Sequence, residues 1–145
     1  RLLARNVDLV VPLCNQRVPP YSYGVYRFGP DGSGILVDLS GKTGLVPVDL
    51  AGSAGLLVRA NVLASLTKPY FRLGQYHAET EGEDIDFFIR AGQAGFQLYV
   101  DTDTTIGHTA MACAWPQRMP DGTYGTRLEM SADLNFTVRF KGEMD

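Results

Sequence analysis

The chain has 145 residues, 45% of them hydrophobic and 20% charged, values typical of a single globular domain that buries its own core. The formal net charge of −3 gives no basic surface for nucleic acid, and no stretch approaches the roughly 20 apolar residues of a membrane-spanning helix. Cys14 and Cys113 lie far apart and have no neighbour at metal-ligand spacing, so we expect free thiols and a reducing, cytoplasmic compartment.

The first segments indicate strands. Arg1–Asn6 has the pattern of a helix end and leads directly into Val7–Leu13, a β-branched run typical of a buried strand. We therefore expect the chain to open in the middle of a fold, as a fragment or processed form would. Tyr21–Phe28 alternates aromatic with small or polar residues, and the turn residues of Pro30–Gly34 predict a hairpin with Ile35–Leu39.

The next segment predicts an edge strand followed by a glycine loop. Leu45–Ala51 is strand-like, but Pro47 cannot donate a ladder hydrogen bond, which favours an edge or a bulge. Gly52–Gly55 interrupts the pattern. Leu56–Arg59 then predicts a short strand, and Ala60–Leu66 a short helix.

The second half contains the strongest helix signal. After a polar loop at 72–82, the helical spacing of apolar residues predicts a helix over Glu83–Ala94, with Gly95 as its C-cap. Strands are predicted at Phe96–Val100 and Thr104–His108. Because a helix is followed after one glycine by a strand, the predicted class is mixed α/β: one domain over residues 1–145, with a mixed β-sheet and flanking helices.

Residues 111–145 give a weaker pattern. A turn is predicted at Pro120–Gly122 and an alternating strand at Asn135–Phe140. The topology of this region cannot be assigned from its pattern, and neither can its role.

Two interpretations stand for the acidic pair at the start of the predicted helix. Thr80 with Glu83 fits a capping box, and carboxylates in a first turn interact favourably with the helix dipole. Alternatively, Glu83 and Asp84 lie at a loop–helix junction, where a carboxylate can act as a general base toward a hydroxyl. The two interpretations are compatible.

Other candidate site residues also have structural explanations. His108 is either a metal ligand or a hydrogen-bonded histidine at a strand end. Asp101–Asp103 has carboxylates two residues apart, a spacing that suits a hard cation, but it also fits a turn after a strand, which we favour. Six aromatic residues could stack on sugar rings, but core packing or hairpin stabilisation also explains them: Tyr21, Tyr23, Tyr26, Tyr70, Phe71 and Trp115.

The order of these features resembles the later half of GT-A-fold glycosyltransferases near family 2. The similarity covers about residues 7 to 109 and runs through five segments in order: Val48–Leu63, Pro69–Arg72, Gly82–Ala91, Ala94–Asp101 and Gly107–His108. It is specific as an ordered set and weak in any single member. It implies a partial GT-A fold that lacks the N-terminal nucleotide-binding part.

The resemblance also implies roles for individual residues. The loop Gly52, Ser53, Ala54 and Gly55, with Tyr70 and Phe71, would bind substrate, and Asp84, paired with Glu83, would be the base of an inverting enzyme. His108 would help to coordinate a divalent cation, Mn²⁺ or Mg²⁺, on a nucleotide-sugar donor. The family's own Asp-x-Asp motif precedes the strand matching Val7–Leu13, so Asp101–Asp103 is not assigned the metal.

This interpretation implies transfer of a sugar to a hydroxyl acceptor such as a glycan, by a chain that is incomplete or inactive on its own. Two alternatives remain: a non-catalytic glycan-binding module, and a structural or assembly domain. The central spatial prediction is that the helix start at Glu83, the glycines around Ser53 and His108 meet at one cavity. We also expect a homo-oligomer, because a partial sheet exposes strand edges.

Overall fold

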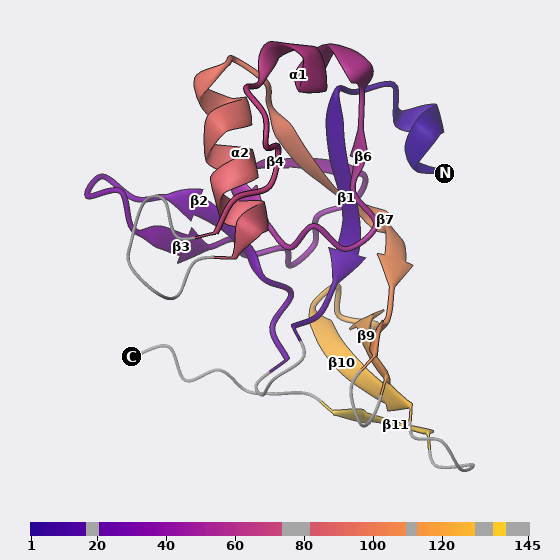
Figure 1. Cartoon of the computed structure of the whole chain (residues 1–145). Coiled ribbons are helices and arrows are strands. Elements are labelled where there is room, and N and C mark those ends of the chain that lie inside the picture. Colours follow the sequence, from indigo (N-terminus) through magenta and orange to yellow (C-terminus); the bar gives the residue numbers. More distant parts are fainter. Residues whose placement is uncertain (17–20, 74–81, 110–112, 130–134, 139–145) are drawn as a thin grey trace.

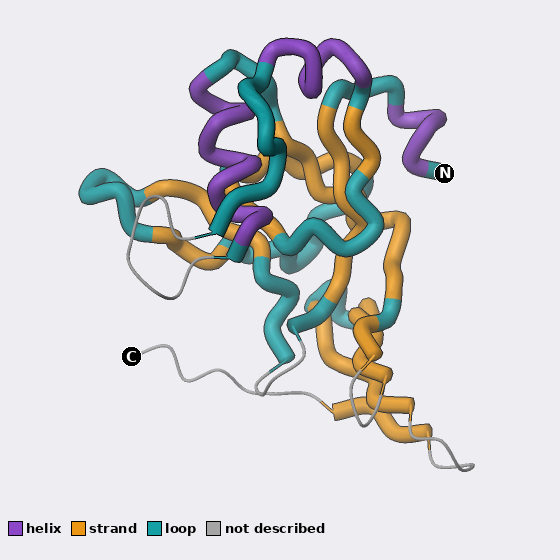
Figure 2. Tube along the Cα trace, in the orientation of Figure 1, coloured by secondary structure: helices purple, strands orange, loops and turns teal. Residues whose placement is uncertain are grey.

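The computed structural model describes residues 1–16, 21–73, 82–109, 113–129 and 135–138. It is a mixed α/β structure with three small sheets and short helices (Figures 1 and 2). The predicted α/β class is therefore confirmed at this coarse level. Among the described residues, no helix is long and apolar enough to cross a membrane.

The first sheet forms the centre of the molecule. Its strand order is β4-β7-β1-β6, with bounds Leu45–Val48, Leu98–Ile106, Leu9–Cys14 and Leu57–Val58. β1 runs parallel to β7, whereas β4 and β6 are antiparallel to their neighbours. Residues 9–13 of β1 are all buried, as expected for a central strand covered on both faces. Pro47 lies in the edge strand β4, so the predicted edge position is confirmed.

β7 differs from its prediction in one informative way. The two strands expected at 96–100 and 104–108 form one strand, Leu98–Ile106, which contains an irregularity. Pro12 of β1 pairs with Asp101, but the next residue, Leu13, pairs with Thr105. Three residues of β7 therefore bulge out of the ladder, and such bulges redirect a strand end. Beyond the bulge, β7 leads to Gly107 and His108.

The second sheet is the predicted hairpin with one added strand. β2 (Val25–Phe28) pairs with β3 (Gly34–Leu36) on one side and with β5 (Leu50–Ala51) on the other. The segment expected to be one strand, Leu45–Ala51, is divided between β4 in the first sheet and β5 in the second. Asp49 lies at the crossing point, where its backbone N–H donates to Tyr26 and its carboxylate accepts from the backbone N–H of Phe28.

The helices follow the sequence prediction closely. They are the 3₁₀ helix η1 (Leu2–Arg5), α1 (Ala60–Ser65) and α2 (Glu83–Gln93). α2 buries Phe87, Phe88 and Ala91 in the core, and Gly95 follows it with a φ of 90°, the left-handed conformation expected after a helix. The predicted capping box is wrong: the N-cap is Gly82, without a side-chain cap bond, and Thr80 lies outside the described residues.

A third sheet is built from the C-terminal region and extends away from the centre of the molecule (Figure 1). Its order is β11-β10-β9-β8, with bounds Asn135–Val138, Tyr124–Glu129, Cys113–Arg118 and His108–Thr109. The predicted turn connects β9 to β10, where Gly122 has a φ of 82° and donates to the carbonyl of Met119. Tyr124 contacts Tyr23 edge-on at 6.1 Å between ring centroids, which joins this sheet to the second one.

Candidate functional site

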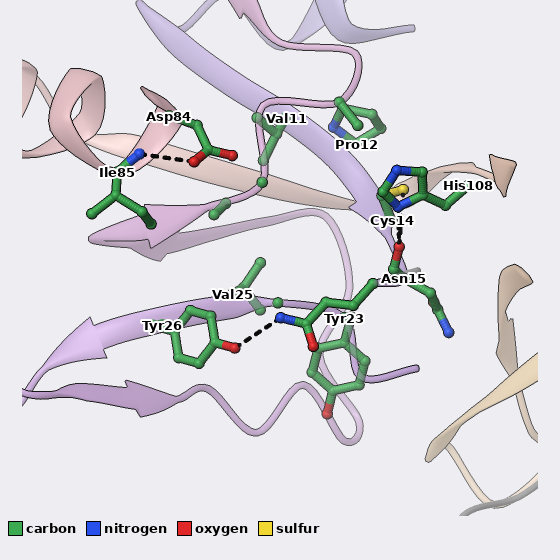
Figure 3. Close-up of a pocket in the computed structure, with 15 residues that line it drawn as sticks. Val11, Pro12, Cys14, Asn15, Tyr23, Val25, Tyr26, Asp84, Ile85 and His108 are labelled. Carbon is green, nitrogen blue, oxygen red and sulfur yellow. Dashed lines mark hydrogen bonds between the residues drawn. The ribbon is translucent and has the colours of Figure 1, made fainter. Parts of the chain in front are cut away.

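One pocket brings together the predicted functional segments. It has a volume of about 380 Å³ and lies between the end of β1, strand β2, the glycine loop and the start of α2 (Figure 3). Gly52, Ala54, Asp84 and His108 all line it. The spatial prediction that the helix start, the glycine loop and the histidine share a cavity is therefore confirmed. Nothing in this geometry yet assigns a role to any of them.

Asp84 is fixed at the rim of the pocket by two backbone groups. Its Oδ2 accepts a hydrogen bond from the N–H of Ser53 at 3.2 Å, and its Oδ1 accepts one from the N–H of Ile85 at 2.9 Å. A Cβ at Gly82 would lie 2.6 Å from Oδ1 of Asp84, so the N-cap position must be glycine for this rotamer. A carboxylate has about four acceptor sites, so Asp84 can still accept a proton or hydrogen bond from a ligand. Glu83, its predicted partner, is exposed and does not line the pocket.

Gly55 determines the path of the glycine loop, residues 52–55. This residue has a φ of 69°, and a Cβ there would lie 2.8 Å from Cγ of Pro12, so only glycine lets the loop pass this close to β1. The N–H of Leu56 donates to the carbonyl of Ser53, which closes the loop and directs the Ser53 N–H at Asp84. A Cβ at Gly52 would meet nothing within 4 Å, so the loop leaves open space on the pocket side.

His108 is fixed at the other end of the pocket. Its Nδ1 lies 2.8 Å from the carbonyl oxygen of Asn15, which favours a proton on Nδ1. The preceding residue, Gly107, is covered by the β9 strand: a Cβ on it would lie 2.5 Å from Sγ of Cys113 and 2.7 Å from the ring of Trp115. The histidine therefore follows a backbone position that is packed too closely for any side chain.

The third sheet supports this end of the pocket, a role that the sequence does not reveal. Asn15 is 2% exposed, and its side-chain amide donates to the hydroxyl of Thr126 in β10 and to the carbonyl of Tyr21. On β9, Trp115 packs over Gly107 and is stacked by Arg127, whose guanidinium carbon lies 5.5 Å from the ring centroid. The hydrogen bond between Asn15 and Thr126 joins residues 111 positions apart in sequence.

Four of the six predicted substrate-binding residues do not line this pocket: Ser53, Gly55, Tyr70 and Phe71. Phe71 is 45% exposed and stacks on Phe87 of α2 with centroids 4.8 Å apart. Tyr70 packs partly against the core, and its carbonyl accepts a hydrogen bond from Arg90. Neither side chain lines the pocket. The structural interpretation, packing against the core and α2, accounts for both positions, and substrate binding by either residue stays a prediction.

Arg90 belongs to a buried ion-pair cluster on α2. The Asp86 carboxylate, 2% exposed, accepts hydrogen bonds from Arg72 at 2.8 and 3.0 Å and from Arg90 at 2.8 Å. Burial raises the pKa of Asp86, but the two guanidinium groups outweigh this effect and hold it below its ordinary value. Arg90 also donates to the backbone carbonyls of Thr67 and Tyr70. The cluster therefore holds the segment before the polar loop against α2.

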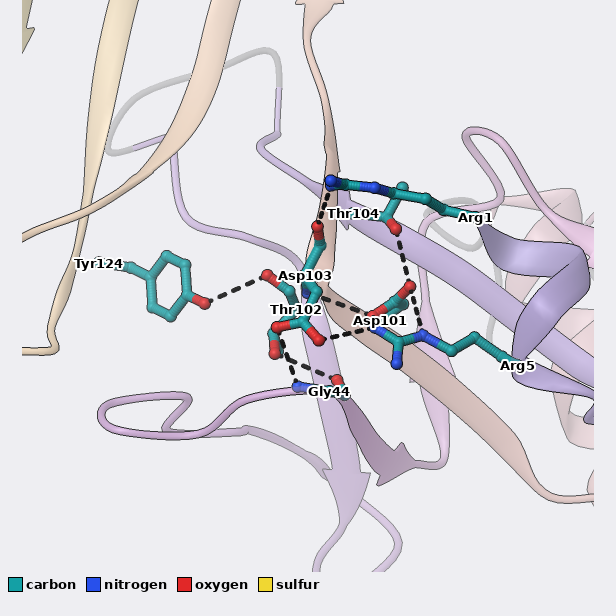
Figure 4. Close-up of polar contacts among 8 residues, drawn as sticks. All are labelled: Arg1, Arg5, Gly44, Asp101, Thr102, Asp103, Thr104 and Tyr124. Carbon is teal, nitrogen blue, oxygen red and sulfur yellow. Dashed lines mark hydrogen bonds and ion pairs between the residues drawn. The ribbon is translucent and has the colours of Figure 1, made fainter.

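The carboxylates of Asp101 and Asp103 form a second polar cluster (Figure 4). Arg5 donates to both oxygens of Asp101, at 2.6 and 3.0 Å, and to Asp103 at 2.7 Å. Burial raises the pKa of Asp101, but the hydrogen bonds, led by that from Arg5, hold it below its ordinary value. The pair thus anchors η1 to the bulge in β7. The favoured interpretation of Asp101–Asp103 as a turn after a strand is wrong, because these residues lie within β7 and the chain bulges there without leaving the strand.

The residues present do not make a complete metal site. In the part of the chain that the structure describes, no group of three His, Cys, Asp or Glu side chains could hold a metal ion. Both oxygens of Asp84 already accept backbone hydrogen bonds. His108 could therefore contribute one ligand to a cation whose other ligands come from elsewhere, which is fewer than a resident cation requires.

Comparisons with known proteins give little further information. No family model matches the sequence, and no curated protein shows a significant match. Among solved structures, the chain is similar to the crystal structure of A197 from STIV, with 19% sequence identity and a TM-score of 0.48. The similarity covers 98% of this chain and 60% of A197. The chain thus spans about three fifths of the length of that protein.

Proposed function

We propose that this chain is the acceptor-side part of an inverting glycosyltransferase with a GT-A fold, in which Asp84 is the general base. The proposal starts from the ordered resemblance of its segments to that family. The observation that carries it is the hydrogen bond from the Ser53 N–H to Asp84. This contact ties the glycine loop to the first turn of α2 and keeps a carboxylate at the rim of the pocket that His108 also lines.

The chemistry requires one carboxylate in this position. The acceptor hydroxyl oxygen forms a bond to the anomeric carbon of a nucleotide-sugar while the bond from that carbon to the diphosphate oxygen breaks. The hydroxyl proton passes to Asp84, and the nucleoside diphosphate leaves with the electron pair of the broken bond. A base within hydrogen-bond reach of the hydroxyl accelerates such a step by about 10²–10⁴-fold. The backbone bonds to Asp84 fix its orientation without occupying all its acceptor sites.

A divalent cation, Mn²⁺ or Mg²⁺, is part of the proposal only in combination with the donor. Such a cation stabilises the charge that develops on a leaving diphosphate. Of the residues that the structure describes in this pocket, His108 is the one we propose as its ligand. Diphosphate oxygens and residues outside this pocket would complete the coordination. A reducing, cytoplasmic setting is also proposed, because Cys14 and Cys113 form no disulfide in the described part of the chain.

The experiment measures sugar transfer by the full-length protein that carries this sequence, with UDP- and GDP-sugars, Mn²⁺ and a panel of hydroxyl acceptors. Release of nucleoside diphosphate that depends on the acceptor supports the proposal. Asp84→Asn should then lower kcat by about 10²-fold or more, and Glu83→Gln should have a much smaller effect. Asp8→Asn, a surface carboxylate near Arg59, is the charge-matched control.

Two other results would contradict the proposal. Saturable glycan binding without any transfer, unchanged by Mn²⁺, would favour the glycan-binding module. Asp84→Asn could instead alter the stability alone and leave every ligand signal unchanged. The acidic pair would then have a structural role in the helix, and this result would favour a structural or assembly domain.

A further inference from the structure

The wall of the pocket that faces Asp84 is built from a polar pair, of which the sequence indicated Tyr26 as an aromatic residue but gave no sign of Gln16. Gln16 follows β1 and Tyr26 lies in β2, and both line the pocket. Figure 3 shows the hydroxyl of Tyr26 on the side of the pocket opposite Asp84, joined to a side-chain amide by a hydrogen bond. That amide is Nε2 of Gln16, at 3.1 Å.

This pair is held in place before any ligand arrives. The hydroxyl of Ser22 donates to Oε1 of Gln16 at 2.8 Å, and the N–H of Gln16 donates to the carbonyl of Ser22 at 2.7 Å. A Cβ at Gly24 would lie 3.2 Å from the Gln16 side chain, so the absence of a side chain at Gly24 makes room for the amide. Preorganised polar groups of this kind bind a ligand with little loss of side-chain entropy.

The two walls present complementary hydrogen-bonding groups. The Tyr26 oxygen accepts from Gln16, so its own O–H proton is available to donate to a ligand oxygen. Asp84, on the other wall, is an acceptor when ionised. A ligand that fits both must offer an acceptor at one end and a donor at the other, and a compound with several hydroxyl groups does so because each hydroxyl is both.

The charge and the apolar surface of the pocket restrict the chemical class of its ligand further. Among the described lining residues, Asp84 is the one carboxylate and no lysine or arginine is present, and in a partly enclosed pocket a carboxylate repels an anionic ligand. Much of the remaining lining is aliphatic, from Val11, Pro12, Val25 and Ile85. Such surfaces suit the C–H faces of a ring. The volume of about 380 Å³ is within the range of small-molecule sites, roughly 300–1,000 Å³.

We propose that this pocket binds an uncharged saccharide unit and that Tyr26 and Gln16 determine its specificity. The inference rests on the proposed function in one respect, since it treats this saccharide as the acceptor. It adds what the proposed function leaves open, namely the class of acceptor and the residues that select it.

The test is an NMR titration of the isotopically labelled protein with neutral methyl glycosides (glucoside, galactoside, mannoside and N-acetylglucosaminide), with glucuronate and with ethanolamine. We expect at least one neutral glycoside to shift the resonances of Asp84 and His108 and to bind more tightly than glucuronate or ethanolamine. Tyr26→Phe should raise its Kd about fivefold, as expected for the loss of one hydrogen bond. Tyr99→Phe, a tyrosine of β7 that does not line the pocket, should leave the Kd unchanged.

Gln16→Leu provides a second variant of similar shape, checked for folding by circular dichroism, and it should also weaken binding. The inference is overturned if no neutral glycoside binds at millimolar concentrations, if glucuronate or ethanolamine binds at least as tightly, or if both variants bind like the wild type. Its failure can be distinguished from that of the proposed function. Glycoside binding without sugar transfer would refute the proposed transferase activity and support the proposed ligand class of the pocket. Transfer to charged or apolar acceptors alone would support the transferase activity and refute the ligand class.

Discussion

Gly107 offers a sharp test of how β9 fixes the histidine end of the pocket. We compare Gly107→Ala with Gly92→Ala, the same chemical change at a site without crowding. A Cβ at position 107 would lie 2.5 Å from Sγ of Cys113 and 2.7–2.8 Å from two ring carbons of Trp115. A Cβ at position 92, on the exposed side of α2, would meet nothing within 4 Å.

The two substitutions should change stability in opposite directions. Contacts below 3 Å force the Trp115 ring, the Cys113 side chain or the backbone to move, and overpacking of this kind costs about 1–3 kcal/mol. Gly92→Ala instead replaces glycine with the best helix former and restricts the unfolded chain, which should stabilise the protein by about 0.5–1 kcal/mol. The difference in unfolding free energy between the two variants should thus be roughly 1.5–4 kcal/mol.

Urea unfolding can be followed by the fluorescence of Trp115, because it is the single tryptophan of the sequence, and independently by circular dichroism. Gly107→Ala should also change the emission of the folded protein and shift the imidazole resonances of His108, which follows the crowded residue directly. Gly92→Ala should do neither. Equal stability of the two variants, or an unperturbed tryptophan in Gly107→Ala, would show that β9 does not pack over Gly107 as described.

The buried ion pairs and the exposed hairpin carry further predictions. Asp86→Asn should lower the unfolding free energy in urea by about 3 kcal/mol, the lower end for a broken buried ion pair, because Arg72 is 29% exposed. Arg5 lowers the pKa of Asp101 in the folded state despite burial. The ionised Asp101 carboxylate therefore contributes its full stabilisation above the unfolded-state pKa, near 3.9, and this contribution is lost as the pH falls through the folded-state pKa. Asp101→Asn should accordingly flatten the pH dependence of stability below about pH 4. Ile35→Lys should reduce self-association in sedimentation velocity, because Ile35 is 53% exposed on the edge strand β3.

Each of these has a control or a contrary outcome. Arg59→Ala removes an exposed ion pair with Asp8 and should lower the unfolding free energy by less than about 1 kcal/mol. A loss as large as that of Asp86→Asn would mean that burial does not determine how much an ion pair contributes to stability. For Asp101→Asn, a pH dependence of stability parallel to that of the wild type would contradict the prediction that ionised Asp101 stabilises the fold. The prediction for Ile35→Lys would be contradicted if the wild-type protein sedimented as a monomer at high concentration.

The elements with agreeing local signals were predictable from the sequence. The helix at Glu83 has apolar spacing along its whole length and a glycine where the left-handed cap falls, and the structure ends it at Gln93. Pro47 excluded its strand from a sheet interior, and β4 is an edge. In these cases periodicity, turn residues and backbone restrictions point to the same answer.

Long-range contacts decided what the sequence could not. Leu45–Ala51 has one continuous strand pattern, yet the hydrogen bonds of Asp49 to β2 divide it between two sheets. The N-cap of α2 is Gly82 and not Thr80, so the capping box did not predict the helix start. The local pattern of Leu45–Ala51 carries no information about the contacts of Asp49.

The candidate site divides in the same way. The ordered resemblance predicted the meeting of the glycine loop, Asp84 and His108, because each is a motif with a local signature. Gln16 and Asn15 have no such signature: their importance arises from partners in β2 and β10 that lie nearby only after folding. For Phe71, the sequence could not separate stacking on α2 from stacking on a ligand, because both require the same residue types.

The most direct test of the account is a crystal structure of the full-length protein with a nucleoside diphosphate and an acceptor analogue. We predict that an acceptor hydroxyl lies within about 3 Å of the Asp84 carboxylate, in the pocket shared with His108. An acceptor bound on another face of the molecule, or an Asp84 side chain turned away from the bound acceptor, would contradict the proposal.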